Sequence, residues 1–156
     1  MSEVVVRRGA HSVALICESG PRCVGVARAE LRKELARWGI EGIEDSAVLI
    51  LSELLTNAVR HGAERGTVLV RIHRWFGRLR IEAHDTSAGR PQLRNSGPDE
   101  TSGRGLVIVE ATADRWGVDD GGDTGKIVWA ELLTEPEHAS APVVVDEARR
   151  ARAAGF

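Results

Sequence analysis

The sequence predicts a two-layer α/β sandwich of the α+β kind, in which helices cover one face of a mixed, mainly antiparallel sheet. Two observations lead to this fold class. Segments with helical spacing of apolar residues, Val24–Trp38 and Ile43–His61, follow each other directly, so the helices are grouped. The β-rich segments Thr67–Trp75 and Leu79–His84 are joined by a short turn, which predicts an antiparallel hairpin. The length of 156 residues suits one domain.

The first half of the chain is expected to hold one strand and two helices. Gly39 and Gly62 each follow a helical segment, in the position where glycine commonly ends a helix. Asp45 or Ser46 stands near the start of the second helix, where a side-chain oxygen can cap free N–H groups. The expected segments, in order, are a flexible N-terminus at 1–10, a strand at His11–Cys17, and helices at Val24–Trp38 and Ile43–His61.

The second half is expected to complete the sheet around a long polar loop. Between Asp85 and Gly103 the chain holds two prolines and two further glycines, and we interpret this stretch as a mobile lid. Residues 11–133 would form the domain, and 134–156 a frayed C-terminal tail. The expected elements are the hairpin strands Thr67–Trp75 and Leu79–His84, a helix at Gly105–Ala113, and strands at Arg115–Val118 and Ile127–Leu133.

Charge and hydropathy argue against several classes of protein. A net charge of -2 gives no broad basic field, so direct nucleic-acid binding is not expected. The longest apolar runs are too short to span a bilayer, and the first residues lack the core of a signal peptide. We therefore expect a cytoplasmic protein without a membrane partner, folded alone or as a homodimer. Cys17 and Cys23 have neither redox-motif nor zinc-pair spacing, and we expect two free thiols.

One face of the second helix carries polar side chains suited to phosphate chemistry. Glu53, Asn57 and His61 follow one another at one-turn spacing, and Arg60 lies beside them. An amide oxygen can hold Mg²⁺, and a carboxylate one turn away can accept a proton from an attacking hydroxyl. The simpler interpretation of such a stripe is the solvated side of an amphipathic helix.

Two further segments bear on the same chemistry. Asp85 ends a strand and opens the long loop, where its carboxylate could accept a hydrogen bond from an adenine amine or simply start a turn. In Ser102–Leu106, Gly103 precedes the expected helix and Gly105 is its first residue, so backbone N–H groups at this helix start could bind phosphate. A flexible hinge is the alternative. The sequence has neither the third glycine of a dinucleotide fingerprint nor a Walker A motif.

These segments together resemble the motifs of the Bergerat, or GHKL, ATPases. The stretch from Glu53 to Gly62 resembles the N box, Asp85–Gly89 the first glycine box and Gly103–Leu106 the second, in the family's order, and the resemblance covers roughly residues 11–133. It implies a general base at Glu53, a Mg²⁺ ligand at Asn57 and an adenine-reading carboxylate at Asp85. The nucleotide-binding positions that it implies are Asn57, Arg60, His61, Asp85, Gly89, Gly103, Arg104, Gly105 and Leu106.

The short single-domain form is similar to the anti-sigma-factor serine kinases. This resemblance implies ATP and Mg²⁺ as cofactors, and it implies as partners a sigma factor and an anti-anti-sigma protein whose serine is phosphorylated. A non-catalytic, ATP-dependent protein-binding module is the alternative, and stand-alone ATP hydrolysis is a third. Ser87 stands where the first glycine box has glycine. Lys126 interrupts a strand in which the family usually has a threonine near the adenine, and no role is carried over to it.

Overall fold

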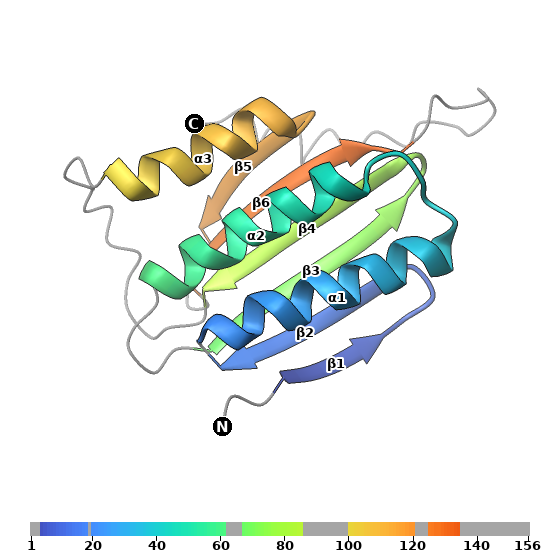
Figure 1. The fold of residues 1–156 in the computed structure, drawn as a ribbon, viewed down its shortest axis with the longest axis horizontal. Helices are drawn as coiled ribbons and strands as arrows, with labels where there is room; N and C mark the ends of the chain where they lie inside the picture. Colours follow the sequence, from blue (N-terminus) through green and yellow to red (C-terminus); the bar gives the residue numbers. More distant parts are fainter. Residues whose placement is uncertain (1–3, 19, 62–66, 86–99, 121–124, 135–156) are drawn as a thin grey trace.

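A computed structural model of the protein describes residues 4–18, 20–61, 67–85, 100–120 and 125–134. Six strands form one sheet in the order β1-β2-β3-β4-β6-β5, and three helices lie on one of its faces (Figure 1). This confirms the predicted sandwich, although every described strand pair is antiparallel rather than mixed. The elements are β1 (Val4–Arg8), β2 (Ser12–Glu18), α1 (Pro21–Trp38), α2 (Glu44–His61), β3 (Thr67–Trp75), β4 (Arg78–Asp85), α3 (Glu100–Thr112), β5 (Arg115–Asp120) and β6 (Lys126–Leu133).

Two expected elements differ from the structure. The segment 1–10, expected to be flexible, contains the strand β1, which pairs with β2 and is the first strand in the sheet order. Val4 and Val6 pack against the core, and the Arg8 guanidinium forms ion pairs with Glu30 and Glu34 of α1, so the strand is held by contacts with distant residues. Helix α3 begins at Glu100, five residues before the expected start at Gly105.

The ends of α1 follow local rules that are visible in the sequence. Proline stands in its first turn, where a missing N–H costs no hydrogen bond. Gly39 adopts a left-handed conformation with φ 67°, and its N–H bonds to the carbonyl of Ala36 while the Ile40 N–H bonds to that of Leu35. This is the Schellman arrangement, which satisfies carbonyls at the end of a helix. The predicted end of this helix is therefore confirmed.

The hairpin between β3 and β4 is as predicted. Trp75 pairs with Arg78, so the turn consists of Phe76 and Gly77, with φ values of 35° and 72°. Two successive positive φ angles are typical of the two-residue turns whose twist matches that of the strands.

The core lies between the helices and the sheet. Alternate residues of β2, β3 and β4 are buried against apolar residues of α1 and α2, as period-2 and period-3.6 patterns require. The largest fully buried apolar side chains are Leu15, Leu31, Leu35, Ile50, Leu51, Leu54, Leu55, Ile72, Leu79 and Ile81. Because α2 contributes four of them, its packing fixes which of its faces remains available for other contacts.

The two cysteines form a disulfide, so the expectation of free thiols is wrong. Cys17 ends the inward-facing row of β2, and Cys23 lies in the first turn of α1 with its Cα 5.8 Å from that of Cys17. Spacing along the chain cannot reveal this pairing, because it depends on the strand and the helix folding back on each other after a tight turn. The bond ties α1 to the sheet at the end of β2.

Candidate functional site

Three elements with sequence-predicted site residues, namely α2, β4 and α3, meet the start of β6 at one end of the molecule. The C-terminal ends of β4 and α2, the start of α3 and the start of β6 lie at the left in Figure 1. The strand register agrees, because Asp85 at the end of β4 pairs with Val68 of β3 and with Lys126 of β6. The antiparallel sheet and the helices above it therefore bring the end of β4, the end of α2 and the start of α3 to the same end of the molecule.

Helix α2 presents its polar stripe away from the core. Leu54, Leu55 and Ala58 are buried, whereas Glu53 and Asn57 are only half-buried. Glu53 and Asn57 are one turn apart and so lie on the same side of the helix. Arg60 and His61 belong to the last turn of α2, but their side chains are outside the described part of the structure. The buried apolar face thus leaves a carboxylate and an amide accessible beside α3.

The Glu53 carboxylate lies directly against Gly105 of α3. A Cβ atom placed on Gly105 would stand 3.1 Å from Glu53 Oε2, closer than ordinary van der Waals contact. Glycine at this position therefore leaves room for the carboxylate between the two helices. This contact joins the predicted N box to the predicted second glycine box.

The position of the glycines relative to α3 corrects one prediction. The sequence predicts Gly103 before the helix and Gly105 at its first position, but both lie inside α3, as do Arg104 and Leu106. The unpaired N–H groups of a helix belong to its first turn, which here starts at Glu100. Any phosphate contact from free N–H groups would thus arise before Gly103. The side chain of Arg104 is not described, and Gly89 and residues 86–99 of the expected lid lie outside the described residues.

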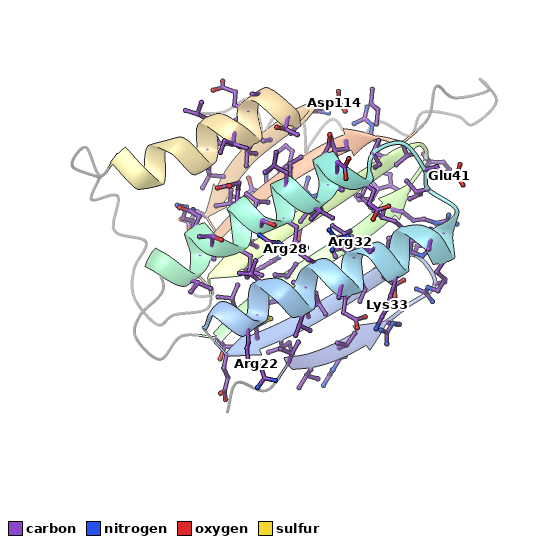
Figure 2. All side chains as sticks on the ribbon, in the orientation of Figure 1. Arg22, Arg28, Arg32, Lys33, Glu41 and Asp114 are labelled. Atoms are coloured by element: carbon purple, nitrogen blue, oxygen red, sulfur yellow. A yellow bond between two sulfur atoms is a disulfide. The ribbon has the colours of Figure 1, made fainter. Side chains whose placement is uncertain are left out.

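A contact between α1 and α2 holds the segment next to Glu53. Arg28 Nε of α1 donates a hydrogen bond of 2.6 Å to Ser52 Oγ, which donates in turn to the Val48 carbonyl at 2.7 Å. Figure 2 labels Arg28 between the two helices. Sequence reasoning missed this pair, because Arg28 and Ser52 belong to different helices and neither lies in a motif.

The donor set fits a magnesium ion that is shared with phosphate groups. Among the described residues there is no group of three or more His, Cys, Asp or Glu that could hold a metal alone. Mg²⁺ usually keeps several waters and takes one or two protein oxygens together with substrate phosphates. The Asn57 amide and the nearby Glu53 carboxylate match that requirement.

No helix in the described segments is long and apolar enough to cross a membrane.

Comparison with known proteins agrees with the motifs and the fold. Residues 17–132 match the family model described as a histidine kinase-like ATPase domain, and this range includes α2, the end of β4 and α3. A search of curated proteins finds no significant match. The family match covers well over half of the 156 residues and agrees with the open antiparallel sheet covered by helices on one face. The chain belongs to the histidine kinase-like ATPase family, the GHKL group of ATP-binding domains.

Proposed function

We propose that this ATP-binding domain is a serine kinase that phosphorylates an anti-anti-sigma protein and also acts as an anti-sigma factor in the cytoplasm. The observation that carries the proposal is the contact between Glu53 and Gly105, since the carboxylate of α2 lies against a residue of the predicted second glycine box. Because Glu53 is half-buried rather than enclosed, an acceptor hydroxyl could reach it.

Each residue would have a distinct part in phosphate transfer. Glu53 would take the proton of the acceptor serine. The serine oxygen would bond to the γ-phosphorus while the bond between the γ-phosphorus and the oxygen that bridges it to the β-phosphate breaks. Asn57 would hold Mg²⁺, which neutralises charge on the phosphates when bound. Asp85, in the last position of β4, would accept a hydrogen bond from the adenine amine. ADP and phosphoserine would be the products.

The test separates nucleotide binding from transfer. Wild type and Glu53→Gln are incubated with labelled ATP and the anti-anti-sigma protein encoded nearest to this chain, and phosphoserine is followed beside ATP affinity. The variant keeps the shape of the side chain but cannot accept the proton, so transfer should fall about 10²- to 10⁴-fold while ATP affinity changes little. Glu110→Gln, on the exposed side of α3, is the matched control and should retain full transfer.

Two results would contradict the kinase proposal in different ways. If wild type binds ATP but phosphorylates no candidate, the non-catalytic ATP-dependent binding module becomes the better account. If Glu53→Gln transfers phosphate as fast as wild type, Glu53 is not the base. Sigma-factor binding is measured separately, with and without ATP, because sequestration needs no phosphate transfer.

A further inference from the structure

The outer face of helix α1 carries only positive charge. Its two acidic residues, Glu30 and Glu34, are buried and pair with Arg8 of β1, and Lys33 and Arg37 share these carboxylates. The basic residues of α1 are all exposed, namely Arg22, Arg28, Arg32, Lys33 and Arg37. Five basic and two acidic residues give α1 a net charge of +3 in a chain of net charge -2, so the rest of the chain carries -5. Positive charge is therefore concentrated on this helix.

Two of the arginines lie on the side of α1 that faces α2 and are held in place there (Figure 2). Arg28 Nε donates to Ser52 Oγ at 2.6 Å, and Arg32 Nε lies 3.3 Å from Glu44 Oε1. Ser52 is neutral, and no ion pair of Arg28 is found within the described part of the chain. An arginine that one N–H already orients can present its other N–H groups to a carboxylate with little further loss of entropy.

An exposed apolar side chain stands beside these arginines. Leu49 of α2 is 41% exposed, and it lies one turn before Ser52, the partner of Arg28. Arginine is enriched in protein–protein interfaces, in which polar groups border an apolar centre. Nucleic acid fits this surface less well, because the exposed Glu44 and Asp45 in the first turn of α2 would repel phosphates. The surface therefore suits a protein with carboxylates around an apolar side chain.

The same surface borders the candidate site. Helix α2 lies between α1 and α3 (Figure 1), and the successive residues Ser52 and Glu53 contact α1 and α3 respectively. A protein that rests on α1 and on Leu49 would therefore lie over the exposed side of α2, with Glu53 directly beside it. That position suits a protein whose serine must approach the Glu53 carboxylate.

We infer that a docking surface formed by Arg28 and Arg32 of α1 and Leu49 of α2 binds the phosphate-accepting protein through carboxylates that flank an apolar side chain. The inference rests on the proposed function insofar as it identifies the bound protein with the phosphate acceptor. A carboxylate of the acceptor would form two parallel hydrogen bonds with Arg28. Complementary charge would speed the encounter and fix the orientation, and contact with Leu49 would bury apolar surface.

The experiment follows phosphorylation of the anti-anti-sigma protein encoded nearest to this chain by wild type, Arg28→Gln, Arg32→Gln and Leu49→Ala. Arg28→Gln should raise the KM for the acceptor protein about tenfold, because an amide cannot form the charged bidentate pair, with kcat and the KM for ATP unchanged. Arg32→Gln and Leu49→Ala should each raise the KM for the acceptor about threefold. Added salt should weaken acceptor binding by wild type more than by Arg28→Gln.

Arg71→Gln is the matched control, because it removes the same charge from an exposed residue of β3 on the sheet face away from the helices. It should change neither kcat nor either KM. Thermal melts check that each variant is folded. An equal rise in the acceptor KM for Arg71→Gln, or no rise for folded Arg28→Gln and Arg32→Gln, would overturn the inference. Phosphorylation by wild type would leave the proposed function standing in both cases.

Calorimetry with the same acceptor protein separates docking from phosphate transfer. If wild type binds the acceptor without phosphorylating it, and Arg28→Gln binds about tenfold more weakly, the kinase proposal fails and the docking surface stands. If wild type neither binds nor phosphorylates the acceptor, both proposals fail. Arg28-dependent binding of a short DNA duplex or of phosphatidylserine vesicles, in place of the acceptor protein, would also overturn the inference.

Discussion

Replacing Gly105 with alanine tests the contact on which the candidate site depends. Gly105 lies inside α3, where alanine is favoured over glycine by about 0.5–1 kcal/mol because it restricts the unfolded chain. The new Cβ, however, would stand 3.1 Å from Glu53 Oε2, so the carboxylate must move by a few tenths of an ångström. The two effects oppose each other, and we expect a net change in unfolding free energy smaller than about 1 kcal/mol.

Gly25 provides the matched control for this substitution. It lies inside α1, and a Cβ placed there would meet nothing within 4 Å. Gly25→Ala should therefore show the helix preference alone and raise the free energy of unfolding by about 0.5–1 kcal/mol, or the melting temperature by about 1–4 °C for a chain of this size. The difference between the two variants in urea or thermal unfolding measures the cost of displacing Glu53.

A double-mutant cycle tests whether Glu53 is the residue that a side chain at Gly105 displaces. In a Glu53→Ala background the obstacle is gone, so Gly105→Ala should become as stabilising as Gly25→Ala. In the Glu53 background it should also slow phosphate transfer by about tenfold, since small displacements of a catalytic group are costly. If Gly105→Ala stabilises the protein equally in both backgrounds, Glu53 does not lie against Gly105 and the assembly of the site is refuted.

Three further predictions concern the metal ligand Asn57, the ionisation of Glu82 on β4 and the disulfide. Asn57→Ala should weaken ATP binding mainly in the presence of Mg²⁺, because it removes a metal ligand; calorimetry showing the same Mg²⁺ dependence as wild type would exclude that role. Burial opposes ionisation of Glu82, but its hydrogen bond with His84 and the charge of Arg80 outweigh burial and lower the pKa of Glu82 from 4.5 to about 2. Ionised Glu82 should thus add about 1–2 kcal/mol of stability above pH 4.5, less than the roughly 3 kcal/mol of the full shift because part of the group meets water; this stability is lost as the pH falls toward 2. The free energy of unfolding of Glu82→Gln, measured in urea, should not show that loss between pH 4.5 and 2. If its dependence on pH is the same as that of wild type, the prediction is contradicted. Reducing the Cys17–Cys23 bond with a dithiol should lower the free energy of unfolding by about 2 kcal/mol for so short a loop, whereas two titratable thiols in the native, unreduced protein would show that the bond does not form.

Much of the fold could be predicted because its signals are local. The end of α1 at Gly39, the hairpin turn at Phe76–Gly77 and the buried stripe of α2 each follow from a few neighbouring residues. The strand β1 and the disulfide could not be predicted in the same way. Strand β1 depends on its pairing with β2, and its Arg8 contacts Glu30 and Glu34, more than twenty residues away. The disulfide depends on how β2 and α1 meet.

The start of α3 was misplaced for a reason that also points to the site. Glycines inside a helix cost about 1 kcal/mol each relative to alanine, so the sequence favours a helix that starts no earlier than Gly105, with Gly103 before it. The structure places both in α3, and at Gly105 it supplies a reason, because a side chain there would press on Glu53. A helix gains nothing in stability from such a glycine. Its presence is best explained by the need to keep the Glu53 carboxylate in place, and the same local signal that misled the helix assignment thus marks where α2 and α3 form the candidate site.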